Sequence, residues 1–178
     1  MLAALGGNLT VGGAVTGTGK VEIDGGTADF AGTLTQNAAF IGVGGGTLEL
    51  THSEAYTGEI SGFSRTGTTT LDLEDISFVS GTTGWSYSGT AASGVLTVQD
   101  GTQVSRITLE GNYTSSAFTL SSDGHGGTNV VDPPAPSSVH TFISAAAAIG
   151  DGAGESLPTH DGDLFAPPML AKPGIWAA

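Results

Sequence analysis

Cysteine is absent from the sequence, and strongly basic residues are scarce. Among 178 residues there are only four lysines and arginines, against 17 aspartates and glutamates, and the formal net charge is −13. Without cysteine there is neither a disulfide framework nor a thiolate zinc site, and the four histidines are too scattered to supply one instead. Because phosphate groups are bound by clustered Lys and Arg, this composition predicts no nucleic-acid partner and no attraction to anionic membranes.

Long apolar runs are also missing. No stretch approaches the ~20 apolar residues of a membrane-spanning helix, so we expect no membrane span. The opening Met1–Leu5 carries no basic residue and ends at a glycine pair, which is unlike a signal peptide. Since a repeat begins at Gly6 with no capping segment before it, we expect the chain to be the downstream part of a longer protein.

Glycine, in contrast, is abundant. There are 30 glycines, and 38% of the residues are hydrophobic, so the chain has apolar surface to bury. One glycine-led motif occurs three times, at Gly6–Val11, Gly25–Phe30 and Gly45–Leu50, with offsets of 19 and 20 residues. In each copy a glycine pair is followed by four residues that alternate between polar and apolar. A glycine turn and a half-buried strand, repeated every ~20 residues, predict a stacked parallel β-solenoid.

In such a stack, equivalent residues lie above one another at the ~4.8 Å spacing of paired strands. The alignment places Ile41–Val43 over Val21–Ile23 in an interior apolar ladder. It places Thr27 and Thr47 on an exterior or turn ladder. A fourth, altered coil is expected over Thr69–Phe78. Its first apolar pair, Leu71 and Leu73, aligns with Val21 and Ile23.

The third coil contains an insertion, His52–Thr57, before the pattern resumes at Gly58. Insertions in a solenoid leave the stack as loops on one face, which is often the binding face. His52 and Tyr56 are therefore candidate binding residues.

Beyond residue 80 the repeat fades and the pattern becomes one of hairpins. Val95–Leu109 alternates around Asp100-Gly101, a strong hairpin signal, and two further short strands flank Ser122–Thr128. Strands that turn back would cover the unpaired edges at the end of a solenoid, and the prolines of Asp132–Pro136 mark a boundary. We therefore expect solenoid coils over 1–80, an antiparallel β-rich cap over 81–132 and an extended proline-linked tail over 133–178.

The tail contains apolar patches that need a place to bury. We expect them to dock on an adjacent molecule and build a fibre or layer, unless the tail acts as a C-terminal secretion signal. The candidate assembly residues are Phe142, Leu164, Phe165, Met169, Leu170, Ile175 and Trp176.

The glycine-threonine coils, together with Leu71-Asp72-Leu73, Gly94–Thr102, Leu109–Tyr113 and Asp123–Thr128, resemble parts of large secreted bacterial surface proteins. Autotransporter passengers, filamentous-haemagglutinin-like adhesins and type I-secreted adhesins are the families concerned, and the likeness covers about residues 6–132. It implies a right-handed parallel β-helix that serves as a stalk, adhesin or scaffold outside the bacterial cell. No run of amphipathic ~10-residue barrel strands ends the sequence, which leaves type I and two-partner secretion as alternatives.

Calcium is the candidate metal. Asp72, Glu74 and Asp75 occupy one expected turn, and Asp123 opens a glycine-rich loop; carboxylate oxygens are the ligands that calcium prefers. For the loop that begins at Asp123, an ordinary Asp-Gly turn is the favoured interpretation. Carboxylate pairs for polysaccharide cleavage could come from Asp72, Glu74 and Asp75 or from Glu49, Glu54 and Glu59. However, Glu49 belongs to the repeat pattern and there is no converging histidine, so we expect no catalytic site.

Trp85 and Tyr87 lie two residues apart and so share one face of a strand. They are candidates for stacking on a sugar, although packing within the cap is the favoured interpretation. The sequence as a whole predicts an all-β protein that is a structural or adhesive segment at the bacterial surface. Its partners would be copies of itself, adjacent domains, glycans or a host surface. The alternatives are a secretion or stability module of an exported polysaccharide-active enzyme, or a glycan-binding module.

Overall fold

A computed structural model describes residues 1–135, which belong to a compact unit, Met1–Ser137. The predicted assembly residues, from Phe142 to Trp176, lie outside the described residues. The elements in chain order are β1 (Leu2–Leu5), β2 (Asn8–Val11), β3 (Lys20–Asp24), β4 (Thr27–Phe30), β5 (Asn37–Phe40), β6 (Gly46–Leu50), the 3₁₀ helix η1 (Ser53–Ala55), β7 (Glu59–Ser61), β8 (Thr69–Leu73), β9 (Gly84–Gly89), β10 (Ser93–Asp100), β11 (Gln103–Glu110), β12 (Thr119–Ser122) and β13 (Thr128–Val131).

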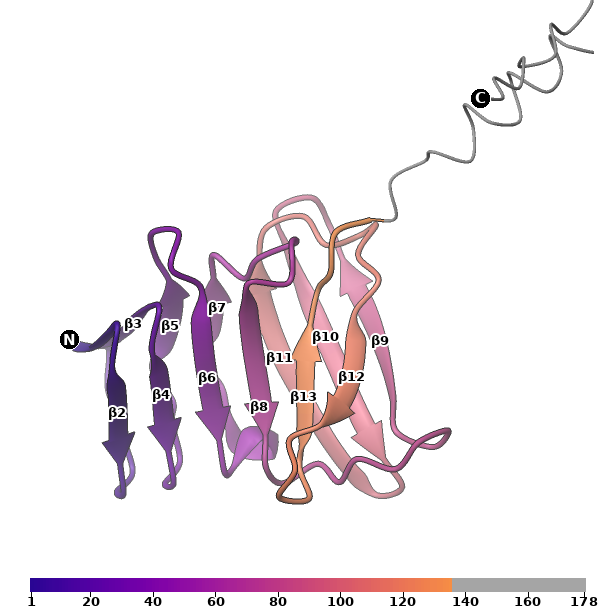
Figure 1. Cartoon of the computed structure of the whole chain (residues 1–178), viewed down its shortest axis with the longest axis horizontal. Helices are drawn as coiled ribbons and strands as arrows, with labels where there is room; N and C mark the ends of the chain where they lie inside the picture. The colour runs from indigo at the N-terminus through magenta and orange to yellow at the C-terminus, as the bar shows by residue number, and fades with distance from the viewer. Residues whose placement is uncertain (136–178) are drawn as a thin grey trace, which may run out of the picture. The chain divides into compact units, whose positions relative to one another are not determined.

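The strands form two facing sheets, the faces of a β-solenoid of about four turns. The first sheet has the order β1-β3-β5-β7-β11-β10-β9, and the second has the order β12-β13-β8-β6-β4-β2. Figure 1 shows successive strands of the second sheet side by side from β2 to β8, with the first sheet behind them. The predicted all-β solenoid is therefore confirmed. Within the described residues, no helix has the length and apolar character needed to cross a membrane.

The three glycine-led motifs stack as the sequence predicts. Leu9 pairs with Ala28, Ala28 with Leu48, and Leu48 with Leu71, in parallel and at offsets of 19, 20 and 23 residues. The outward ladder of Thr27 and Thr47 is also confirmed. Alternation along each strand turns every second side chain inward, which builds a continuous apolar core between the sheets.

Two predicted alignments are wrong. Val43, expected in the interior, is 100% exposed, because Ala38 and Phe40 take the places over Val21 and Ile23 and leave 41–45 as a loop. Leu71 does not continue the Val21 ladder either. It pairs with Leu48 in the opposite sheet, because β7 already takes the next place in the first sheet and the 62–68 loop turns the chain into the second sheet before β8.

Stacked glycines form the corner where the two sheets meet. A Cβ on Gly26 would overlap the carbonyl oxygen of Gly7, and one on Gly46 would lie 2.6 Å from the carbonyl oxygen of Gly26. Real Cβ atoms do not approach an oxygen so closely, so Gly26 and Gly46, the second glycines of the second and third motifs, are packing requirements of the stack.

The expected insertion leaves the stack after β6 and forms the turn η1, and the stack resumes at β7. Ser53 within it is buried, and its hydroxyl donates a 2.5 Å hydrogen bond to Asp75. This hydrogen bond attaches the insertion to the next coil, and strand β11 packs against η1.

Antiparallel strands end both sheets, as predicted for the cap. In the first sheet β11 adds in parallel to β7, and β10 and β9 then turn back in a meander. In the second sheet β13 pairs antiparallel with β8, and β12 pairs with β13. Figure 1 shows these strands gathered at the end of the molecule opposite β2.

Candidate functional site

The outward face of the second sheet carries a ladder of acidic side chains. Strand register places Thr10, Asp29, Glu49, Asp72 and Asn129 in successive rungs. Neighbouring strands are ~4.8 Å apart, so three carboxyl groups follow one another at close spacing. Like charges directly opposite one another on a sheet destabilise it.

Two carboxyl groups of the acidic ladder have raised pKa values. Burial raises the pKa of Glu49 to about 7, assisted by a hydrogen bond with Glu74 and by the charges of Asp29, Glu74 and Asp72. Burial also raises the pKa of Asp72 to about 6, where the charges of Asp123 and Glu74 add to the effect and His125 opposes it. At neutral pH this surface therefore binds protons that isolated carboxylates would release.

Three of the four predicted calcium ligands come together and one does not. Asp72, Glu74 and Asp123 lie close enough for their charges to interact. Asp75 is directed elsewhere, because its carboxylate accepts hydrogen bonds from the Ser53 hydroxyl and from the Glu54 amide.

The Asp123 carboxylate is occupied by its own loop. Its Oδ1 accepts hydrogen bonds from the amides of His125, Gly126 and Gly127 at 2.6, 2.9 and 3.0 Å, the arrangement of an Asx-type turn. Within residues 1–135, no cluster of three or more Asp, Glu or His side chains has the arrangement of a metal site. Calcium binding stays a prediction.

The aromatic pair of strand β9 packs within the cap. The Trp85 ring meets Phe118 edge-on at a centroid distance of 5.2 Å and remains 38% exposed. The Tyr87 ring lies 6.1 Å from both Tyr113 and Phe118, and it is half-buried. Part of the Trp85 surface thus remains accessible, whereas Tyr87 mainly holds the cap together.

The two candidate residues of the insertion are separated by burial. His52 is exposed at the start of η1. Tyr56 is only 5% exposed and belongs to the core, so its assignment as a surface binding residue is wrong. The loop folds back onto the stack, and the Tyr56 ring therefore packs into the apolar core.

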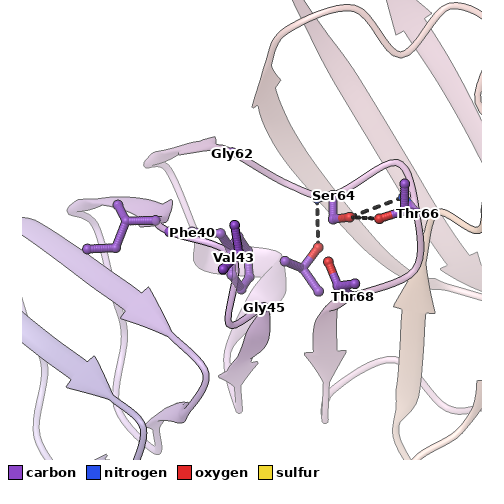
Figure 2. A pocket seen from close by; sticks show the side chains of 10 residues that line it. Phe40, Val43, Gly45, Gly62, Ser64, Thr66 and Thr68 are labelled. Carbon is purple, nitrogen blue, oxygen red and sulfur yellow. Dashed lines mark hydrogen bonds between the residues drawn. The ribbon is translucent and has the colours of Figure 1, made fainter.

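A hollow of about 360 Å³ lies at one corner of the stack, between the β5–β6 loop and the β7–β8 loop (Figure 2). One wall contains Phe40, Ile41 and Val43, and the other contains four hydroxyl side chains. The Ser64 amide donates to Thr69 Oγ1 at 2.8 Å, and the Ser64 and Thr66 hydroxyls share a 2.8 Å hydrogen bond. The lining has no charged residue, which suits a small neutral ligand that bears hydroxyl groups.

The sequence contained signals for both unpredicted features. The acidic ladder was visible in the repeat, because Asp29 and Glu49 occupy equivalent positions after their glycine pairs. The hollow forms because the corner loops lengthen from Gly25-Gly26 to 41–45 and then to 62–68. The sequence indicates that these corner loops lengthen, but it does not predict the hollow, because the space between two loops depends on their conformations.

Comparison with protein-family models, with curated proteins and with solved structures gave no match to this chain. The arrangement of the chain's own residues is thus the basis for the functional proposals that follow.

Proposed function

We propose that this chain is a structural and adhesive segment of a secreted bacterial surface protein. The observation that supports the proposal is the pair of continuous parallel ladders closed at one end by antiparallel strands. Such a stack holds its loops at fixed spacing along an axis, as a stalk must, and the cap protects the edges that would otherwise aggregate.

The distribution of side chains agrees with this role. The interior is filled with apolar residues, outward carboxylates such as Glu49 and Asp72 repel one another, and Asp75 is bonded to the neighbouring coil. A stability or secretion module of an exported polysaccharide-active enzyme is the alternative that shares this fold.

Beads coated with the full chain would test the role. We expect them to be retained on cell surfaces, and we expect Phe118→Ala, which disrupts the cap, to abolish retention because adhesion depends on the folded stack. Polysaccharides incubated with the same protein should keep their chain length. Retention equal to that of uncoated beads, or shortening of a polysaccharide, would contradict the proposal.

A second candidate is binding of a neutral glycan, which the uncharged hydroxyl-lined hollow and the partly exposed Trp85 favour. A glycan array probed with the wild type and with Thr66→Val, Trp85→Ala and Tyr87→Ala would separate the sites. Loss in Thr66→Val alone assigns binding to the hollow, and loss in Trp85→Ala alone assigns it to the cap. The absence of any signal from the wild type excludes the candidate.

The proposal includes self-assembly through the tail, residues 133–178. Deleting these residues should reduce the size of assemblies measured by light scattering at high concentration. Equal sizes for the truncated and full chains would rule out that part of the proposal.

A further inference from the structure

The sequence contains two Asn-X-Thr triplets, Asn8-Leu9-Thr10 and Asn112-Tyr113-Thr114. This triplet is the acceptor pattern for sugars that are attached to an asparagine side chain. An attached sugar is bulky and needs an exposed position, usually in a surface loop. The structure places the two triplets in different settings, so it distinguishes them where the pattern alone does not.

The first triplet is part of a paired strand. Asn8 and Thr10 lie in β2 and pair in parallel with Thr27 and Asp29 of β4. Pairing keeps the backbone extended, with Asn8 and Thr10 ~7 Å apart along the strand. This triplet can adopt a turn only if β2 leaves the sheet.

The second triplet lies in the loop between β11 and β12 and forms an Asx turn. Asn112 and Thr114 are both exposed. Asn112 Oδ1 accepts a hydrogen bond from the Thr114 amide at 3.1 Å and another from the Thr114 hydroxyl at 2.8 Å. A backbone amide can only donate, so the accepting atom must be Oδ1 and the other carboxamide atom must be Nδ2. Neither hydrogen bond uses Nδ2, which is the atom that bears the sugar in an N-linked glycan.

The middle residue of this triplet fixes the direction in which the other two face. Tyr113 is 4% exposed, and its hydroxyl donates a 2.6 Å hydrogen bond to the Phe63 carbonyl oxygen. The Ser116 amide donates to the Tyr113 carbonyl oxygen, which closes a second turn directly after the triplet. Because the middle side chain is anchored in the core, Asn112 and Thr114 are held on the outside of the cap.

We propose that Asn112 is the acceptor site for an N-linked sugar and that Asn8 is not. The donor is a sugar whose anomeric carbon is bonded to a diphosphate, and the catalyst is an asparagine glycosyltransferase. Asn112 Nδ2 attacks the anomeric carbon and forms a C–N bond. The C–O bond to the diphosphate breaks and leaves its electron pair on the departing oxygen, while a base of the transferase takes one Nδ2 proton.

The Asx turn suits both the reaction and its product. The Thr114 hydroxyl orients the carboxamide through Oδ1, so Nδ2 is available to the donor. Oδ1 keeps both of its hydrogen bonds after the sugar is attached, so the loop does not have to change its conformation.

Two classes of donor share this chemistry, because the diphosphate can be joined to a nucleoside or to a polyprenyl lipid. One arm of the experiment incubates the purified full chain with a soluble asparagine glycosyltransferase and UDP-glucose. The other arm uses a membrane-bound oligosaccharyltransferase and a polyprenyl-diphosphate oligosaccharide. Trypsin cuts after Lys20 and Arg106 and so separates Asn8 from Asn112. Mass spectrometry should find sugar on the peptide that begins at Ile107 in at least one arm, and none on residues 1–20.

Four variants test the role of each side chain. Asn112→Gln should abolish the modification, and Asn8→Gln is the matched control that should leave the yield unchanged. Thr114→Val keeps the shape of the side chain without the hydroxyl and should lower the rate about tenfold, the effect of one lost hydrogen bond. Thr114→Ser keeps the hydroxyl and should retain most of the rate. Unchanged melting of the unmodified variants would show that the fold is intact.

A full chain that gains no sugar in either arm overturns the proposal. Equal rates at Asn8 and Asn112 overturn it too, because the triplet alone would then select the site and the loop conformation would not matter. A rate that Thr114→Val leaves unchanged contradicts the role of the hydroxyl. Bead retention measures none of these quantities, so the acceptor site is tested independently of the surface role.

Discussion

The corner glycines are the residues on which the stack depends most directly. Gly26→Ala would drive a methyl group into the Gly7 carbonyl, and the coil would have to shift. We expect a loss of about 1–3 kcal/mol in the free energy of unfolding, the usual range for overpacking. Urea denaturation of the dilute protein measures it.

Gly7→Ala is the matched control, because its Cβ would enter open space. Its effect on the dilute protein should stay within about 0.5 kcal/mol. Equal losses for the two variants would show that lost glycine flexibility, and not the stacking contact, governs the corner.

The acidic ladder makes stability depend on pH. In the native state the pKa of Glu49 is raised to about 7 and that of Asp72 to about 6, above the ordinary values of 4.5 and 3.8. Between these limits the native state binds more protons than the unfolded state, so stability falls as pH rises. We expect the melting temperature to fall from pH 5.5 to pH 8.

Glu49→Gln removes the central rung and should flatten this slope. Thermal melts of both proteins across the pH range measure the difference, and Glu22→Gln serves as the control because Glu22 lies on the other sheet. A slope that persists unchanged in Glu49→Gln would assign the pH dependence to other groups.

At the scale of elements, the cap is held by an aromatic cluster that joins strands far apart in sequence. Phe118 packs against the rings of Phe63, Trp85, Tyr87 and Tyr113, and it is almost fully buried. Phe118→Ala should cost about 3–5 kcal/mol, as large-to-small core changes do. Val43→Ala should be nearly neutral, because Val43 is fully exposed. Urea denaturation of both variants would test the pair, and similar losses would contradict the assignment of core and loop.

The repeat strands, the loop that contains Val43 and the position of Tyr56 show how much of the fold the sequence could predict. Alternation and the glycine pairs were enough for strands β2, β4 and β6, because their register follows the repeat. The 41–45 loop was mistaken for a strand because Ile41–Val43 alternates like Val21–Ile23, and local pattern does not reveal that Asn37–Phe40 occupies the sheet. Tyr56 was misplaced for a related reason, since a loop that folds back looks like one that projects.

The candidate sites were harder to predict than the fold. The acidic turn residues were identified, but Asp75 is diverted to Ser53 and Glu54, and Asp123 to its own loop amides. These hydrogen bonds join residues of different coils or depend on one turn conformation. A one-dimensional pattern indicates which residue types are present, whereas the partner that each carboxylate selects depends on how the coils stack.

The whole chain carries a formal charge of −13. Repulsion between exposed charges is screened once the Debye length falls to ~10 Å or less. Added NaCl should therefore raise the melting temperature, and CaCl₂ at matched ionic strength should do no more. A larger rise with CaCl₂ would support the calcium hypothesis, because a ligand of the native state raises the midpoint.

The contrast between the coils and the cap has a consequence for the order of folding. Coil pairings join residues 17 to 23 positions apart, as in Lys20 with Asn37 and Leu50 with Leu73, whereas the β10–β11 hairpin begins with Asp100 beside Gln103. Local pairings close at a smaller entropic cost and form faster. We expect the hairpin to nucleate folding and the coils to add to it one after another, toward β1. Pulsed hydrogen exchange should protect the amides of Val95–Val98 before those of β2, and the reverse order would show that the stack grows from β1 and β2 toward the cap.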